Sequence, residues 1–347
     1  MIETLQHRIR DAAARRSALR LRGGGSKDFY GNALRGEILD TRGYAGIVDY
    51  EPTELVVTAR CGTPLSELEN LLAKNGQCLP FEPPHFGADA TVGGCIAAGL
   101  SGPRRASAGA LRDFVLGVKL IDGRGQALSF GGRVMKNVAG YDVSRLVAGS
   151  LGTLGLIAEV SLKLSPAPPE ERTLRLETSQ ARALELMNRW AGRPLPISAT
   201  AWHDDDLTVR LSGAAAAVRA AAGVIGGETI DGAFWRGVRE HTDAFFGGDQ
   251  PLWRLSLPST SPPLELEGRQ LVEWNGGLRW LKSAMAAGAL RDALRRVKGH
   301  ATLFRAQDKS AGCFAPLDPV LERLQRQLKS AFDPAGIFNP GRLLAER

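Results

Sequence analysis

The stretch RGGGSKD at residues 22–28 follows a short apolar segment and combines three consecutive glycines with a serine, a lysine and an aspartate. Consecutive glycines leave backbone N–H groups unobstructed, and such a run can wrap a phosphate without a helix behind it. Neither the G-x-G-x-x-G fingerprint nor the Gly-Lys-Ser/Thr order of a P-loop is present in this turn. The turn is therefore expected to be either a flexible connection or a cradle for a pyrophosphate.

Two further segments are dense in small residues. GADATVGGCIAAGLSGPRRASAGA, residues 87–110, could form a tightly packed helix, but each glycine would weaken that helix by about 1 kcal/mol relative to alanine. We expect instead a backbone that lies flat against a large planar ligand. The segment GSLGTLGLIAEVSLKL, residues 149–164, places more glycines before a buried strand. Three such segments within about 150 residues favour one large ligand over three unrelated turns.

The elements around these segments indicate an α+β protein. The pattern predicts an opening helix over 2–16 and a strand, SALRLR, that runs into the glycine turn. Further strands are predicted at 46–50, 54–60, 113–122, 126–131 and 153–164. The proline-rich SPAPPEE at 165–171 has the composition of a boundary, and strands and helices of a second unit follow it.

Charge and cysteine content limit the function classes. The net charge of +7 and pI near 9.5 suit an anionic ligand or an acidic partner. The basic residues are scattered, so no nucleic-acid partner is expected. Four cysteines, Cys61, Cys78, Cys95 and Cys313, include no close pair, so any iron–sulfur cluster must belong to another chain. The charged amino terminus and the lack of an 18-residue apolar run predict a cytoplasmic protein.

The motifs GGGS, ATVGG, GSLGTLGLIAEVSLKL and DPAGIFNPGRL occur in an order that resembles the vanillyl-alcohol oxidase/p-cresol methylhydroxylase (PCMH) superfamily of FAD-binding proteins. Within it, PPHFGADATVGGCIAAGLSGPRR and GGRVMKNVAGYDVSRLVAGSLGTLGLI are most similar to FAD-binding E subunits of glycolate oxidases. The resemblance implies a two-lobed PCMH-type FAD-binding domain over 1–168 and an α+β, ferredoxin-like cap over 169–325. It also implies a C-terminal segment, 326–347, that returns to the flavin.

The resemblance also implies roles for individual residues. The first loop should cradle the FAD pyrophosphate, the second segment should face it and continue along the ribityl chain and flavin, and the third should meet the adenine half. The FAD-binding residues expected on this basis are Gly23, Gly24, Gly25, Ser26, Lys27, Thr91, Gly93, Gly94, Gly99, Ser101, Gly109, Gly155, Ile157 and Asn339. For Asn339 the alternative is a turn-former before Pro340. Because the first loop has no histidine, FAD is expected to bind non-covalently.

The cap departs from the catalytic relatives. Those that oxidise 2-hydroxy acids carry a strand close to G-H-x-G-D-G-N-x-H, whereas this chain reads GHATLFRAQDK. Gly299 and His300 match, but the second histidine is missing, so no metal site is expected and the catalytic residue is unassigned, with His300 as the candidate. His85, in PPHF, is more often a structural residue than a base.

The resemblance implies a subunit of a glycolate oxidase complex that converts glycolate, a small 2-hydroxy acid, to glyoxylate. Its expected partners are a paralogous catalytic flavoprotein and an iron–sulfur subunit that receives the electrons. Any contact with the inner membrane is expected through these partners. Two alternatives remain open: a stand-alone FAD oxidoreductase with another hydroxylated substrate, and a non-catalytic scaffold subunit.

Overall fold

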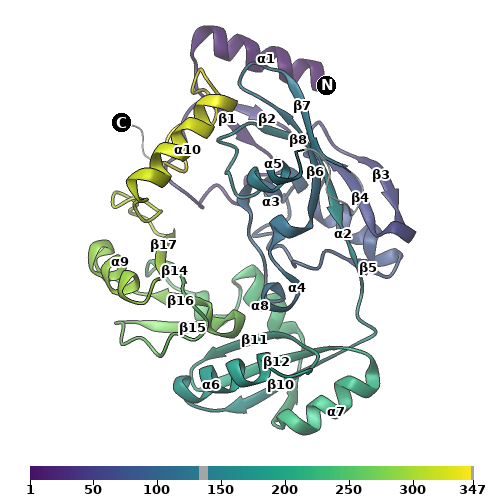
Figure 1. Cartoon of the computed structure of the whole chain (residues 1–347), viewed down its shortest axis with the longest axis vertical. Helices are drawn as coiled ribbons and strands as arrows, with labels where there is room; N and C mark the ends of the chain where they lie inside the picture. The colour runs from purple at the N-terminus through teal and green to yellow at the C-terminus, as the bar shows by residue number, and fades with distance from the viewer. Residues whose placement is uncertain (133–139, 345–347) are drawn as a thin grey trace.

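Two antiparallel sheets organise the molecule (Figure 1). The computed structural model describes residues 1–132 and 140–344. The first lobe contains a five-stranded sheet in the order β3-β4-β8-β6-β7, and the cap contains an eight-stranded sheet. In Figure 1 the first lobe lies above the cap, and the last helix and the tail run back up to the first lobe.

The centre of the first lobe is β8 (Leu156–Lys163), whose nearly continuous apolar run is buried. Its side chains enter two apolar clusters, one with α2 (Leu65–Lys74) and α3 (Val92–Ala98) and the other with α1 (Ile2–Arg15). The other strands are β1 (Leu19–Arg22), β2 (Glu37–Asp40), β3 (Ile47–Glu51), β4 (Val56–Arg60), β6 (Val115–Ile121) and β7 (Ala127–Gly131). The predicted strands of this lobe are therefore present, and β2, which pairs with β1 in parallel, is an addition.

The shorter elements of the first lobe connect these layers. They are η1 (Pro52–Glu54), β5 (Gln77–Cys78), α4 (Arg105–Ala108), η2 (Leu111–Phe114), α5 (Tyr141–Leu146) and β9 (Ser165–Pro166). The expectation that residues 87–110 avoid a helix is wrong in part, because 92–98 form α3. Thr91 caps this helix by accepting a hydrogen bond from the Gly94 N–H at 3.3 Å, and packing of Cys95 and Ile96 in the core outweighs the glycine cost.

The cap begins with a ferredoxin-like β-α-β-β-α-β unit, as the sequence predicted. Its elements are β10 (Glu170–Glu177), α6 (Gln180–Ala191), β11 (Ile197–His203), β12 (Asp206–Gly213), α7 (Ala215–Ile225) and β13 (Glu228–Ile230). After α8 (Ala233–Glu240) and η3 (Ala244–Phe246), a second unit extends the same sheet. It consists of β14 (Leu252–Ser256), β15 (Arg269–Glu273), η4 (Trp274–Gly276), β16 (Leu278–Lys282), α9 (Ala287–Arg296) and β17 (His300–Arg305).

Polar contacts join the two lobes. Glu82 of the first lobe forms ion pairs with Arg210 of β12 and with Arg104. Burial alone would raise the pKa of Glu82, but the two guanidinium groups outweigh it and lower the pKa. Trp274 donates its indole N–H to the carbonyl of Gly102 at 3.1 Å. These buried contacts fix the orientation of the cap sheet toward the glycine-dense segment of the first lobe.

The last helix, α10 (Pro319–Phe332), leads into a tail that returns to the first lobe. Asp333 accepts hydrogen bonds from the N–H groups of Ile337 and Phe338, and the Asn339 N–H donates to the Leu19 carbonyl at 2.9 Å. We propose a domain boundary between β8 and β10, close to residue 168. A boundary at 325/326 would cut α10, so the C-terminal segment is better begun at Asp318.

No helix in residues 1–132 and 140–344 is long and apolar enough to cross a bilayer.

Candidate functional site

The glycine turn after β1 is pressed against the second glycine-dense segment. A side chain at Gly24 would place its Cβ 1.5 Å from the Asp89 carbonyl oxygen, and one at Gly23 would lie 2.2 Å from the Thr91 Oγ1. Gly25 has a φ of 75°, a conformation that suits glycine. The bare backbone is thus required in part by the chain's own close packing, which holds the two segments together as one wall.

These two segments and the tail line a cleft, which we call the cofactor cleft. The predicted site residues that line it are Gly23, Gly24, Gly25, Ser26, Lys27, Thr91, Gly94 and Asn339. Lining residues that the sequence analysis did not single out are Leu21, Arg22, Asp28, Leu34, Ala97, Ala98, Leu151 and Arg342. Three segments far apart in the sequence therefore meet at one place, and most of the predicted pyrophosphate residues meet there.

The cofactor cleft carries more positive than negative charge. Arg22 and Arg20 both pair with Asp28, so one carboxylate serves two guanidinium groups. Arg342 is buried and donates to the carbonyl oxygens of Asp28, at 2.8 Å, and Lys27. The Lys27 ammonium donates to the His85 carbonyl at 3.0 Å, and burial lowers the pKa of Lys27. With free backbone at the turn, this surplus of cations suits an anionic group such as a pyrophosphate.

Asn339 has a structural role at the cleft. Its side-chain oxygen accepts the Leu21 N–H at 2.8 Å, and its amide group donates to the Leu151 carbonyl at 2.6 Å. Its φ of 41° also fits the turn that the sequence suggested. Both ends of the amide are engaged, so Asn339 fastens the tail to β1 and to the glycine-dense segment near Leu151.

Six predicted site residues do not line the cofactor cleft as the structure describes it: Ser101, which lines a second cavity described below, and five others. Gly93 packs on Cys61, Gly99 packs on Gly149, and Gly155 packs on the Ile121 carbonyl, so these glycines allow close backbone contact. The other two are Gly109, which ends α4 with a φ of 112°, and Ile157, which is buried in the sheet core. Their predicted contacts with FAD stay predictions.

A second cavity, which we call the interlobe cavity, lies between the first lobe and the cap. It is lined by Pro84, Phe86, Leu100, Ser101, Gly102, Pro103, Val238, Arg239, His241, Arg254, Glu273, Leu278, Trp280 and Phe304. Ala98 lines the cofactor cleft and Leu100 lines this cavity, so the same stretch of backbone borders both. Ser101 is the one predicted site residue that lines the interlobe cavity, and it follows Ala98 of the cofactor cleft by three residues.

Polar groups in the interlobe cavity stand among aromatic rings. Trp280 donates its indole N–H to the Glu273 Oε1 at 2.8 Å, and burial raises the pKa of Glu273 to about 7. His241 stacks on Phe246 with ring centroids 3.9 Å apart. The Nδ1 of His241 is buried without a hydrogen-bond partner among the described residues, and burial lowers its pKa well below the usual range. Nothing local in the sequence marks these residues, because they come from separate strands and a helix end.

His300, the catalytic candidate from the sequence, lies exposed at the start of β17, opposite Ser256 of β14. It is not among the residues that line the interlobe cavity. His85 is held in place, with its Nε2 2.9 Å from the Glu69 Oε2 and its backbone N–H on Glu240. The structural interpretation of His85 therefore fits its contacts.

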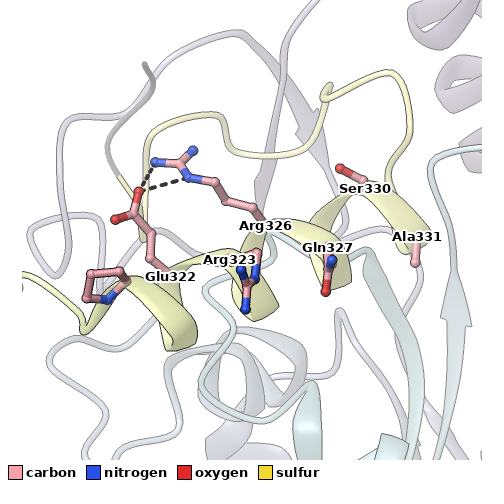
Figure 2. A pocket seen from close by; sticks show the side chains of 7 residues that line it. Glu322, Arg323, Arg326, Gln327, Ser330 and Ala331 are labelled. Carbon is pink, nitrogen blue, oxygen red and sulfur yellow. Dashed lines mark hydrogen bonds and ion pairs between the residues drawn. The ribbon is translucent and has the colours of Figure 1, made fainter.

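A hollow along α10 is a different kind of surface (Figure 2). Figure 2 shows Glu322 bound to Arg326 on the helix, with Arg323, Gln327 and Ser330 projecting beside them. The described lining comes from this one helix, and no predicted site residue is part of it. The candidate functional site is therefore the cofactor cleft together with the interlobe cavity.

Comparisons with known proteins agree with this geometry. Residues 1–131 match a protein family described as "FAD binding domain". The chain is 47% identical over 344 residues to the glycolate oxidase subunit GlcE of Escherichia coli (strain K12), which covers 99% of this chain and 97% of the relative. The glycolate oxidase subunit GlcD of Bacillus subtilis (strain 168) is 33% identical over 128 residues, 37% of this chain and 27% of that relative.

The fold has solved counterparts. A structure of alkyldihydroxyacetonephosphate synthase superposes with a TM-score of 0.68 over 98% of this chain and 76% of that chain, at 14% identity. The two-lobed FAD-binding fold predicted from the sequence is thereby confirmed. The FAD-binding match covers the glycine turn and Thr91, and the identity to one relative extends over nearly the whole length, so the chain belongs to the GlcE family of glycolate oxidase subunits.

Proposed function

We propose that this chain is the FAD-binding subunit of a glycolate oxidase complex, which oxidises glycolate to glyoxylate. The observation that carries the proposal is the cofactor cleft, where a glycine turn, a capped helix and the tail meet around surplus positive charge. The full-length similarity to GlcE supports the substrate, since that relative is named a glycolate oxidase subunit.

The residues of the cofactor cleft fit FAD. The turn at Gly23–Gly25 and Ser26 would hold the pyrophosphate, and Arg22 and Arg342 would balance its charge. Hydrogen bonds to a charged group contribute about 1.5–3 kcal/mol each, so a few backbone donors suffice for firm binding. When bound, FAD supplies the acceptor for the two electrons and hydrogen that leave the substrate carbon. Because the lining of this cleft includes no histidine or cysteine among the described residues, we propose that FAD is held without a covalent link.

We propose that the electrons leave the chain for another subunit. We propose that the partners are a paralogous flavoprotein and an iron–sulfur subunit, supported by the name of the GlcE relative and by the absence of any close cysteine pair in the sequence. We further propose that the complex is cytoplasmic and meets the inner membrane only through these partners.

Anaerobic addition of glycolate to the co-expressed complex tests the function. We expect the flavin absorption near the visible maximum to bleach, and acid precipitation to release the flavin into the supernatant. A yellow pellet would contradict non-covalent binding. A flavin that glycolate leaves oxidised in the assembled complex would contradict glycolate oxidation and favour a different hydroxylated substrate.

A further inference from the structure

We propose that the interlobe cavity binds a small 2-hydroxy acid, with Arg254 as the anchor for its carboxylate and Glu273 as the acceptor of its hydroxyl proton. The inference rests on the proposed function, which supplies the flavin that takes the electrons. It places a working active site in this subunit, although the histidine pair of the catalytic relatives is missing.

The placement of these residues follows from the strand pairing. Arg254 of β14 pairs with Trp280 of β16, which pairs in turn with Leu271 of β15. Alternate residues of a strand share a face, so Glu273 lies on the same face as Leu271. Leu271 and Trp280 belong to the apolar cluster that contains Leu100 of the first lobe. The register therefore brings a guanidinium group and a carboxylate to the face that meets the glycine-dense segment.

Arg254 differs from Arg210 and Arg342 in having no polar partner among the described residues, a feature that it shares with the half-buried Arg105 and Arg305. Arg210 and Arg342 are both hydrogen-bonded to carboxylate or carbonyl oxygens. Arg254, in contrast, forms no hydrogen bond or ion pair with any described residue, and its guanidinium lies 5.3 Å from the ring centre of Trp274. Arg105 of the first lobe lies over the same ring at 4.4 Å. Of these two guanidinium groups, that of Arg254 lines the interlobe cavity, and a guanidinium group without a bound carboxylate in a cavity wall is suited to an anionic ligand.

Glu273 is arranged to accept a proton. One of its oxygens holds the Trp280 indole N–H, and the carboxylate is buried in the cavity wall. Burial raises its pKa to about 7, against the opposing effects of the Trp280 hydrogen bond and the Arg254 charge. A base with a pKa near the working pH is well matched to general-base catalysis. The unpartnered Nδ1 of His241 offers a further polar contact for a ligand in the same cavity.

The chemistry balances with these groups. The O–H bond of the hydroxyl breaks and its proton goes to the Glu273 carboxylate, while a C–O double bond forms. The C–H bond on the same carbon breaks, and its electron pair and hydrogen go to the flavin as hydride. Arg254 keeps the carboxylate in place throughout and gains or loses no proton.

Binding of oxalate, a redox-inert dicarboxylate, to the FAD-loaded full chain tests the role of Arg254. Calorimetry and the fluorescence of Trp274 and Trp280 give readouts that do not depend on turnover. Two charge-assisted hydrogen bonds at about 1.5 kcal/mol each imply that Arg254→Met weakens oxalate binding about 100-fold at unchanged FAD content. The matched control is Arg296→Met, an exposed arginine of α9, which should bind oxalate like the wild type. Equal oxalate affinity in Arg254→Met, or loss of FAD from that variant, would overturn the proposal.

Glu273 requires a separate measurement. Glu273→Gln should slow flavin reduction by glycolate about 10²–10⁴-fold, the usual cost of losing a general base, while oxalate affinity changes by less than about threefold. Glu273→Asp keeps a carboxylate, so it should restore part of the flavin reduction rate. The rate should also increase with pH again in this variant. The charged groups that face Glu273 are Arg254 and Glu82, so the flavin reduction rate is followed across pH 5.5–8.5 in a constant salt. A Glu273→Gln rate equal to that of the wild type would remove the carboxylate from the mechanism.

The two proposals fail in different ways. If glycolate leaves the wild-type flavin oxidised in the complex, the proposed function fails whatever Arg254 does. If the wild type is reduced and Arg254→Met is reduced with the same KM, only the interlobe site is wrong.

Discussion

The cofactor cleft and the interlobe cavity border the same stretch of backbone, yet they are built in opposite ways. One wall of the cleft is glycine backbone. Gly23 and Gly24 pack on Thr91 and Asp89 of the second glycine-dense segment, and Gly25 packs on the Arg22 side chain. The cavity is made largely of side chains, with two arginines, a glutamate and a histidine among aromatic rings. The first arrangement suits a large cofactor that is held by main-chain groups, and the second suits a small polar molecule that must be oriented.

The comparison predicts that a side chain added to the glycine turn of the cleft prevents FAD binding. In Gly24→Ala the new Cβ would lie 1.5 Å from the Asp89 carbonyl oxygen, so the turn and residues 89–91 must separate. We expect loss of nearly all bound FAD and a lower melting temperature, because the backbone must move. Flavin absorbance per mole of purified protein and thermal unfolding measure the two effects. Full FAD occupancy in this variant would show that the turn does not form the cradle.

The sequence predicts the cofactor cleft better than the interlobe cavity, because the cleft residues lie in short contiguous motifs and the cavity residues do not. The glycine turn, Thr91 and Asn339 stand in short contiguous motifs, and the structure brings them to one cleft. Arg254 and Glu273 are placed by non-local strand pairing in the cap, which no local pattern reveals. Likewise, α3 forms despite its glycines because tertiary packing and the Thr91 cap outweigh propensity.

A second prediction is that the buried Glu273 carboxylate lowers the free energy of unfolding at alkaline pH. The pKa of Glu273 is about 7 in the folded chain, above the ordinary 4.5, so the stabilising effect of the neutral form is complete below about pH 4.5 and is lost as pH rises through 7. At pH 8.5 the cost reaches about 3 kcal/mol, from 1.36 kcal/mol per pKa unit. Glu273→Gln should therefore unfold at higher urea than the wild type at pH 8.5, and at similar urea at pH 5. A wild type equally stable at both values, relative to Glu273→Gln, would contradict the shifted pKa.

A third prediction concerns the exposed edge of the cavity face. His300 lies outside the lining of the interlobe cavity, so His300→Ala should change glycolate-dependent dye reduction by the complex less than about tenfold, below the usual cost of losing a general base. The assay compares variants at matched flavin content. A drop of 100-fold or more would move the proton acceptor from Glu273 to His300.

The smallest effect is expected at a glycine with no contact role. Gly223 lies in α7, and a Cβ there would meet no atom within 4 Å. Gly223→Ala should raise the free energy of unfolding by about 0.5–1 kcal/mol and leave FAD content unchanged. It is the matched control for Gly24→Ala. Loss of FAD from this variant would mean that alanine substitutions disturb the lobes generally.

The most direct test of the account is an experimental structure of the FAD-loaded chain soaked with oxalate. The account predicts the pyrophosphate against Gly23–Gly25 and Arg342, and an oxalate carboxylate within hydrogen-bond distance of the Arg254 guanidinium. A pyrophosphate bound away from the glycine turn, or an oxalate that binds without Arg254, would contradict it.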